Sequence, residues 1–248
     1  MYIHHEIQNE RATIRIVRPE KRNALDGAGW AALWQILATL ASPSALRLLT
    51  VCSTGDVFCG GADVDWLAEA PEAELRRIGE VIEQFRALPV PVVCRVQGPT
   101  FGGGIGLVAA ADLAIASASA TFTFSEARIG LAPVLISPSV IARVGAQRFR
   151  TWALLAQPIS AAEALAAGLV DVVTSPEELD QTVAALEQQL YGGAPGSQAA
   201  IKQIPEAGLL PEAAAKVLAG LRSASDYAEG VRAFRERRVP RWVKADFA

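Results

Sequence analysis

Phe58-Cys59-Gly60-Gly61-Ala62-Asp63 is the first of two glycine-rich stretches in this chain, and Phe101-Gly102-Gly103-Gly104-Ile105-Gly106-Leu107 is the second. Each stretch lies where a predicted strand gives way to a helix. Small residues let a ligand approach the backbone closely, and the N–H groups at a helix start have no partner within the helix. Two such N–H groups directed at one point would stabilise a developing oxyanion. The pair therefore indicates chemistry on a carbonyl group, with a thioester as the favoured kind.

The overall composition is that of a globular protein with a substantial core. The chain has 248 residues and half of them are apolar, which suits one large domain or one domain with a small appendage. It carries 26 acidic and 23 basic residues, for a net charge of −3. This nearly equal number of acidic and basic residues argues against nucleic-acid binding. An anionic ligand would have to be held by a local cluster of cations.

Cysteine and histidine usage argues against several kinds of site. The cysteines are Cys52, Cys59 and Cys94, an odd number without metal-ligand spacing, and we expect reduced thiols in a cytoplasmic protein. His4 and His5 both lie beside the N-terminus, so a Ser–His–Asp or Cys–His relay and a histidine-based metal site are not expected. We likewise expect no signal peptide and no membrane contact, since no apolar run approaches the roughly 18–20 residues that span a bilayer.

Predicted strands alternate with predicted helices along most of the chain, which indicates an α/β fold. Strands are expected at about 12–17, 46–52, 91–96, 113–116 and 121–124, and helices at about 27–40, 71–88, 103–111, 138–145, 147–156 and 160–167. A linker is expected at Gly192-Gly193-Ala194-Pro195-Gly196-Ser197. Beyond it the sequence favours helix alone, so we divide the chain into a core over 1–191 and a C-terminal helical region over 192–248.

Six blocks, in order along nearly the whole chain, resemble the enoyl-CoA hydratase/isomerase (crotonase) superfamily. The blocks are Arg18-Pro19-Glu20-Lys21-Arg22-Asn23-Ala24-Leu25, Phe58-Cys59-Gly60-Gly61-Ala62-Asp63, Gln97-Gly98-Pro99-Thr100-Phe101-Gly102-Gly103-Gly104, Ala111-Asp112-Leu113-Ala114-Ile115-Ala116, Phe124-Ser125-Glu126-Ala127-Arg128-Ile129-Gly130-Leu131 and Ile159-Ser160-Ala161-Ala162-Glu163-Ala164-Leu165-Ala166-Ala167-Gly168-Leu169-Val170. Three glycines alone would be weak evidence, whereas six blocks in the expected order are specific.

The resemblance implies both a fold and a ligand. The fold is a crotonase-type spiral of ββα units whose C-terminal helical region forms a homotrimer or a dimer of trimers. The ligand is an acyl-CoA thioester, in which coenzyme A is part of the substrate, and no metal or other cofactor is implied. Matched position by position, the oxyanion-hole amides belong to Ala62 and Gly103, and each would donate to the thioester oxygen as it gains enolate character.

Glu126 is the carboxylate at a position where the family places an acid or a base. Outside such a block, a glutamate is usually a solvated side chain. Here we expect it to activate water for addition at the β-carbon, or to return a proton in the reverse dehydration. Apolar neighbours such as Phe101, Phe124 and Ile129 would raise its pKa. Many hydratases of the family carry a second glutamate, but Gly106 stands at that position, so Glu126 acts alone or with help from a hydroxyl or water.

A narrower resemblance links the chain to the methylglutaconyl-CoA and isohexenylglutaconyl-CoA hydratases. It is carried by Ala62-Asp63-Val64-Asp65-Trp66-Leu67, by Gly103-Gly104-Ile105-Gly106-Leu107-Val108-Ala109-Ala110 and by Ile136-Ser137-Pro138. A glutaconyl group has a free carboxylate that needs a cation, for which Arg128 and Arg143 are candidates, although a solvent-facing salt bridge is the more ordinary role for each. Ser137 is a candidate to offer a hydroxyl to the acyl group, with a turn serine as the alternative.

Contacts to coenzyme A follow from the same matching. Lys21 and Arg22 match positions where the family places cations near the nucleotide phosphates. The predicted contacts to substrate and coenzyme A together are Lys21, Arg22, Ala24, Gly61, Ala62, Asp63, Val64, Asp65, Gly102, Gly103 and Ser137. The basic tail from Phe234 to Lys244 is expected to pack through Phe234 and Trp242, since a single basic run in an acidic protein is poor support for nucleic-acid binding.

The function that these residues predict is that of an enoyl-CoA hydratase, a carbon–oxygen lyase that adds water across a 2,3-enoyl-CoA thioester. A branched glutaconyl-type chain is the suggested acyl group. An isomerase, a decarboxylase or a hydrolase on the same scaffold is an alternative, because all of them need the same oxyanion hole. A non-catalytic acyl-CoA-binding subunit is a further alternative, favoured by the missing carboxylate at Gly106.

Overall fold

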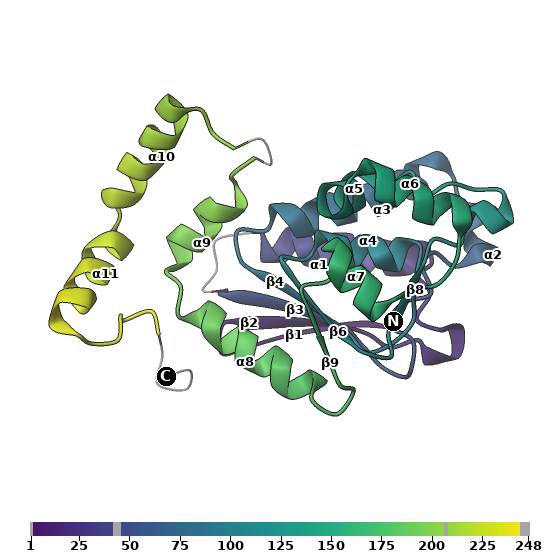
Figure 1. The fold of residues 1–248 in the computed structure, drawn as a ribbon, viewed down its shortest axis with the longest axis horizontal. Coiled ribbons are helices and arrows are strands. Elements are labelled where there is room, and N and C mark those ends of the chain that lie inside the picture. The colour runs from purple at the N-terminus through teal and green to yellow at the C-terminus, as the bar shows by residue number, and fades with distance from the viewer. Residues whose placement is uncertain (1, 42–45, 206–207, 244–248) are drawn as a thin grey trace.

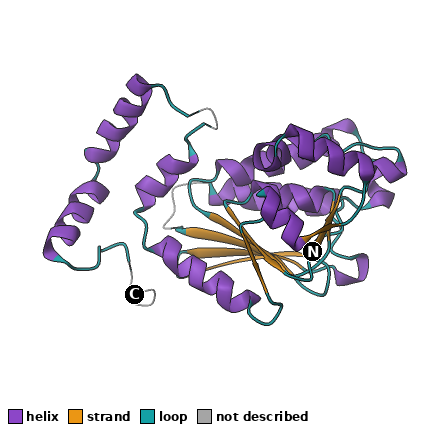
Figure 2. Ribbon diagram, in the orientation of Figure 1, coloured by secondary structure: helices purple, strands orange, loops and turns teal. Residues whose placement is uncertain are grey.

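Two β-sheets form the centre of the molecule (Figure 2). The computed structural model describes residues 2–41, 46–205 and 208–243, so Lys244 and the rest of the predicted C-terminal region after it lie outside the described residues. The larger sheet has the order β1-β2-β3-β4-β6-β9 and the smaller one the order β5-β7-β8. The strands are β1 (Ile3–Gln8), β2 (Arg11–Ile16), β3 (Leu48–Ser53), β4 (Val92–Val96), β5 (Thr100–Phe101), β6 (Leu113–Ser117), β7 (Thr121–Thr123), β8 (Ile159–Ser160) and β9 (Val172–Thr174).

Helices cover both faces of the larger sheet. Figure 1 shows α1, α3 and α4 on one face and α8 on the other. The helices are α1 (Gly27–Leu40), α2 (Val64–Leu67), α3 (Glu72–Ala87), α4 (Gly103–Ala110), α5 (Ser137–Val144), α6 (Ala146–Leu155), α7 (Ala161–Ala167), α8 (Leu179–Tyr191), α9 (Pro195–Lys202), α10 (Pro211–Arg222) and α11 (Ser225–Glu236), with short 3-10 turns η1 (Pro19–Lys21) and η2 (Glu126–Ile129). This layering explains why β3 is buried along its whole length and has a nearly continuous apolar sequence.

The chain winds as a spiral that visits each sheet in turn. It passes from β4 in the larger sheet to β5 in the smaller one and then into α4, and from β6 to β7 and then on to α5 and α6. Within the larger sheet, the pairs β2–β3, β3–β4, β4–β6 and β6–β9 are all parallel, so each turn adds one strand at the same edge. The predicted α/β spiral of ββα units is therefore confirmed.

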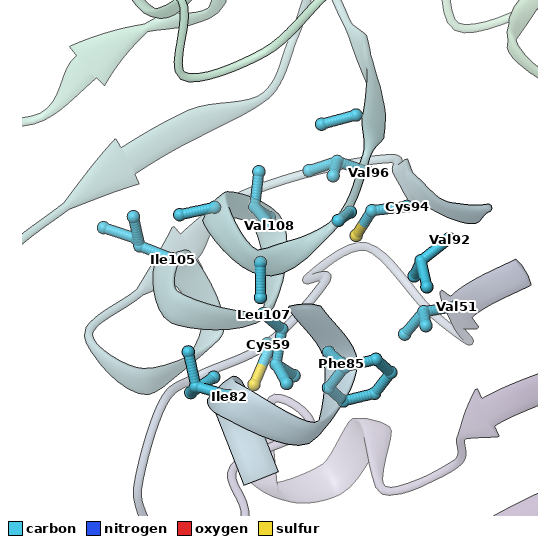
Figure 3. Packing of buried hydrophobic residues seen from close by; sticks show 14 of the residues in the cluster. Val51, Cys59, Ile82, Phe85, Val92, Cys94, Val96, Ile105, Leu107 and Val108 are labelled. Atoms are coloured by element: carbon cyan, nitrogen blue, oxygen red, sulfur yellow. The ribbon is translucent and has the colours of Figure 1, made fainter. Parts of the chain in front are cut away.

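The helix that carries the second glycine-rich stretch lies in the core. In α4, the residues from Gly104 to Ala110 are all buried, as expected for a helix that is apolar on every side. Figure 3 shows Ile105, Leu107 and Val108 of this helix packed with Ile82 and Phe85 of α3 and with residues of β4. This packing fixes the direction in which the first amides of α4 point.

Most predicted elements lie where the sequence placed them, with boundaries shifted by a few residues. Asp26 caps α1 as expected, because its side chain accepts a hydrogen bond from the Gly29 amide. Strand β1 was not predicted, since five of its six residues are exposed and it has no apolar face. The helix expected after the first glycine-rich stretch is α2, a single turn capped by Asp63.

The C-terminal helices α10 and α11 stand apart from both sheets and are joined to the core through α9 (Figure 1). The side chain of Phe234 is 85% exposed in the single chain, so it does not pack against the chain's own core. Trp242 does contact the chain, since its indole N–H donates to the Gly192 carbonyl at 3.1 Å. Among the described residues, no helix is both long enough and apolar enough to cross a membrane.

Candidate active site

The two glycine-rich stretches meet so that their backbone amides lie close together. Leu25 forms a parallel bridge with Ala62, in which the Leu25 amide donates to Gly61 at 2.8 Å and the Leu25 carbonyl accepts from Asp63 at 2.9 Å. Because backbone groups alternate along an extended segment, the Ala62 N–H points away from Leu25. A Cβ built on Gly103 would lie 3.7 Å from the Ala62 nitrogen. The first amide of α4 and the Ala62 amide are thus neighbours.

Neither of these amide N–H groups forms a hydrogen bond within the described part of the chain. Within the described part of the chain, the N–H groups of Ala62 and Gly103 donate to no backbone or side-chain acceptor. Most backbone N–H groups in a folded protein are paired, so two adjacent unpaired ones mark a place where a ligand oxygen can be bound. This is the donor arrangement that stabilises an enolate oxygen.

Glycine is required where the two stretches approach each other. Gly61 has a φ of 84°, and a Cβ there would lie 2.9 Å from the Phe101 carbonyl oxygen. Gly102 has a φ of 42°, and a Cβ there would lie 2.7 Å from Oε1 of Glu126. Both positions combine the left-handed backbone region with a close contact, so a side chain would separate the amides or displace the glutamate.

Glu126 begins η2, which follows β7 after Phe124 and Ser125, and its carboxyl group lies against Gly102. Its Oε2 is buried and has no hydrogen-bond partner among the described residues. Burial raises the pKa of Glu126, as the sequence analysis predicted. A buried carboxyl oxygen without a partner, beside two unpaired amides, is suited to exchange protons with a bound ligand.

Two adjoining cavities meet at these amides. The inner cavity, of about 220 Å³, has a mostly apolar wall that includes Leu75, Ile78 and Ile129, and Glu126 is the one ionisable side chain among its described lining residues. The outer cleft, of about 420 Å³, is polar and includes Lys21, Arg22 and Asp65. Residues Gly60, Ala62, Val64 and Ser125 line both. An elongated ligand with a polar part and an apolar part would therefore place its junction beside Ala62.

Nearly all of the predicted contact residues border these cavities. Those that line the outer cleft are Lys21, Arg22, Ala24, Ala62, Asp63, Val64 and Asp65. Those that line the inner cavity are Gly61, Ala62, Val64, Gly102, Gly103 and Glu126. The Lys21 ammonium lies 3.5 Å from the Asp65 carboxylate at the mouth of the outer cleft, which holds this cation near the cavity.

Three candidate side chains are directed elsewhere. The Ser137 hydroxyl donates to the Val134 carbonyl at 2.8 Å, and Ser137 is not among the described residues that line either cavity, so the structure gives no support to its predicted contact with the acyl group. Arg143 binds Asp171 at 2.9 Å and donates to the carbonyls of Ala109 and Ala111. Arg128 likewise does not belong to the described lining of the two cavities.

Ile136 is a site residue that the sequence analysis did not identify. A Cβ built on Gly106 would lie 2.5 Å from Cγ2 of Ile136 and 3.1 Å from Cδ1 of Ile82. The space beside Gly106, where a second glutamate would project, is thus filled by two apolar side chains. The apolar residues Leu131, Val134 and Leu135 of the same segment also line the inner cavity. This apolar run before α5 is the one feature of the sequence that could have indicated a cavity wall there.

The other reactive groups near the site are inert or dispersed. Cys59 is completely buried, and burial raises the pKa of its thiol to about 12, so it remains protonated at neutral pH. Over residues 2–41, 46–205 and 208–243, no three His, Cys, Asp or Glu side chains gather in the way a metal site requires. The chemistry that the geometry offers is therefore that of Glu126 and the two amides.

Comparison with known proteins places the chain in a family. The Enoyl-CoA hydratase/isomerase family matches residues 6–245. An (E)-benzylidenesuccinyl-CoA hydratase from Thauera aromatica is 31% identical, with 95% of this chain and 96% of that protein covered. A methylmalonyl-CoA decarboxylase from Escherichia coli is 28% identical, with 95% of each covered. The solved structure of Pseudomonas aeruginosa AtuE is 31% identical and superposes with a TM-score of 0.93, with 98% of this chain and 100% of that chain covered. Since the family match spans almost the entire sequence, the chain belongs to the enoyl-CoA hydratase/isomerase family.

Proposed function

We propose that this protein is an enoyl-CoA hydratase in which Glu126 is the single acid–base group. One observation carries the proposal: the buried Oε2 of Glu126 has no partner among the described residues and lies beside the unpaired amides of Ala62 and Gly103. These groups meet where a polar cleft joins an apolar cavity. An acyl-CoA thioester fits that division, with the coenzyme in the outer cleft and the acyl chain in the inner cavity.

The proposed reaction uses one carboxyl group twice. The Glu126 carboxylate takes a proton from a water molecule whose oxygen forms a bond to C3 of the enoyl thioester. The electron pair of the double bond moves toward the thioester carbonyl, and the amides of Ala62 and Gly103 stabilise the resulting enolate oxygen. The Glu126 carboxylic acid then returns its proton to C2. The sum is addition of one water, and Glu126 ends in its original state.

Isomerisation of the double bond is the second candidate, and the packing of Ile136 on Gly106 favours it. An isomerase moves a proton from C2 of a 3-enoyl thioester to Glu126 and back to C4, so it needs neither water nor a second acid. Ile136 and Ile82 occupy the space beside Gly106, and Glu126 is the one ionisable side chain in the described lining of the inner cavity. Hydration, in contrast, requires a water to be held without a second carboxylate.

The acyl group of the proposed substrate is a branched 2,3-enoyl chain of the glutaconyl type. The sequence resemblance to that branch supports this choice. The inner cavity does not supply an arginine for the free carboxylate, because Arg128 and Arg143 are absent from its described lining. The assay must therefore compare acyl groups with and without that carboxylate.

The test is an absorbance assay of the conjugated thioester. Purified protein is mixed with crotonyl-CoA, methylglutaconyl-CoA and a 3-enoyl-CoA in separate reactions. A hydratase lowers the absorbance of the first two as their conjugation is lost, and product analysis finds a 3-hydroxyacyl-CoA. An isomerase raises the absorbance of the third and leaves the first unchanged. Tight binding of all three thioesters without turnover would contradict both proposals and favour a binding subunit.

We propose further that the protein acts as a homotrimer or a dimer of trimers in the cytoplasm and needs no resident cofactor. The C-terminal helices support the assembly. Leu218 of α10 and Phe234 of α11 line a cavity of about 860 Å³ between α9, α10 and α11, although both are exposed in the single chain. An exposed apolar surface of this kind favours contact with another protein surface.

A further inference from the structure

Arg18 joins the segments that surround the Ala62 amide. Its Nη1 donates to the Ala24 carbonyl at 2.9 Å and to Oδ2 of Asp63 at 2.9 Å. Its Nη2 lies 3.4 Å from Oδ2 of Asp26. The guanidinium also stacks 4.9 Å from the centre of the Tyr2 ring. One largely buried cation thus contacts residues on both sides of Leu25 and the residue that follows Ala62.

These contacts hold the backbone segment that presents the amide. Leu25 is hydrogen-bonded to Gly61 and Asp63, the two neighbours of Ala62. Arg18 ties the residue before Leu25 to the side chain of Asp63. Asp63 also accepts from the Asp65 amide at 3.1 Å as the cap of α2. The direction of the Ala62 N–H therefore depends on a bridge that two backbone hydrogen bonds form, and the Arg18 guanidinium adds a side-chain connection between its two segments.

Hydrogen bonds anchor the loop that carries Arg18 to neighbouring segments. The Asn23 side chain accepts from the Arg18 amide at 2.8 Å and donates to the carbonyls of Thr54 and Val57 at 2.7 Å each. The Tyr2 hydroxyl donates to Asp26 at 2.7 Å and accepts from the Asp26 amide at 3.0 Å. Arg18 is thus held from several directions, and it is not among the described residues that line either cavity.

We propose that Arg18 is a positioning residue that aligns the Ala62 amide for the enolate oxygen without touching the substrate. The proposal rests on the function given above, because it assumes that Ala62 serves as an oxyanion donor. A lysine ammonium keeps the positive charge but cannot reproduce the several fixed N–H directions of a guanidinium. Arg18→Lys should therefore retain only part of the alignment of the Ala62 amide. Methionine keeps the apolar stem and leaves the carboxylates of Asp63 and Asp26 without their cation.

The test measures enolate stabilisation directly. Acetoacetyl-CoA is a thioester whose enolate absorbs in the near ultraviolet, and the fraction bound as enolate reports the strength of the oxyanion hole even if no hydration occurs. The variants are Arg18→Met, Arg18→Lys and the control Arg95→Met. Arg95 pairs with Asp180 at the surface and is absent from the described lining of both cavities. Affinity for coenzyme A and the fraction folded are measured in parallel.

For Arg18→Met we expect the ratio of bound enolate to bound ketone, and kcat on the best substrate, to fall by about 10- to 100-fold. Arg18→Met should bind coenzyme A as tightly as the wild type does. The enolate ratio of Arg18→Lys should lie between those of the wild type and Arg18→Met. Arg95→Met should have the wild-type enolate ratio. The proposal is overturned if either Arg18 variant, corrected for its folded fraction, keeps the wild-type enolate ratio. It is also overturned if coenzyme A affinity and enolate formation are lost together. A wild type that forms enolate but hydrates nothing would contradict the proposed function and leave this test intact.

Discussion

At the scale of single residues, Glu126 carries the proposed chemistry because of where it is buried. Its carboxyl contacts Gly102, one oxygen has no partner among the described residues, and burial raises its pKa. A carboxylate whose pKa is raised is a stronger base than an ordinary glutamate, and its conjugate acid can return the proton that it takes. In the proposed reaction the two amides assist that exchange, since they bind the thioester oxygen more strongly as it gains enolate charge.

Replacing Glu126 by glutamine should abolish turnover while acyl-CoA binding is retained. Glutamine fills the same space but cannot exchange protons, so we expect kcat to fall by about 10²- to 10⁴-fold. The control is Glu80→Gln, which alters an exposed glutamate paired with Arg76 on α3. Steady-state kinetics with the best thioester would measure both variants, and normal turnover by the Glu126 variant would refute the single-glutamate mechanism.

The same residue should make folding stability depend on pH. A carboxyl whose pKa is raised above its ordinary value of 4.5 favours the folded state when protonated. Its contribution is therefore complete below pH 4.5 and is lost as pH rises through the raised pKa. We expect the free energy of unfolding of the wild type, relative to Glu126→Gln, to decrease from pH 4.5 upward. Urea denaturation of both proteins between pH 4 and 8 would show it, and a constant difference would contradict the expectation.

At the scale of elements, α4 contributes both to the candidate site and to the packing of the core. Its first amide faces the cavities, while Gly106, one turn later, meets Ile136 just before α5 and Ile82 of α3. The helix is therefore held by contacts that also shape the inner cavity. A change at Gly106 acts on both, because a close-packed interior transmits small displacements.

Gly106→Ala should destabilise the protein although alanine usually favours a helix. Its Cβ would lie 2.5 Å from Ile136, so we expect a loss of about 1–3 kcal/mol in the free energy of unfolding. Gly220→Ala on α10 is the matched control: a Cβ there has nothing within 4 Å, and a gain of about 0.5–1 kcal/mol is expected. Denaturant unfolding measures both changes, and adding Ile136→Ala should recover part of the loss at Gly106. An unchanged free energy of unfolding for Gly106→Ala would contradict this prediction, because it would mean that Ile136 can move aside at no cost.

At the scale of the whole molecule, the spiral brings five distant segments to one place. Residues near 25, 62, 102, 126 and 136 border the inner cavity or its amides, although more than 100 residues separate the first from the last. The C-terminal helices α10 and α11 stand outside this core. Their exposed apolar side chains would be buried against another subunit in the proposed trimer.

Charge placed on that surface should dissociate the assembly. We expect the wild type to sediment as a trimer or hexamer, and Phe234→Glu combined with Leu218→Glu to sediment as a monomer, because the side chains are 85% and 67% exposed in the single chain. Ile7→Glu on the edge strand β1 is the control, since Ile7 is also exposed but lies far from α11 in sequence and on another element. A monomeric wild type, or an intact oligomer of the double variant, would contradict the proposed assembly.

The amino-acid sequence by itself determined the α/β class, the positions of most helices and strands and the two glycine-rich turns. These features depend on local patterns, namely apolar periodicity, helix caps and glycine where the backbone requires it. The tertiary structure alone decided that Ile136 fills the space beside Gly106, that Ser137 turns to Val134, and that Arg18 ties Asp63 to Ala24. Such contacts join residues far apart in the chain or depend on one rotamer, and both are set by packing, which no local pattern records.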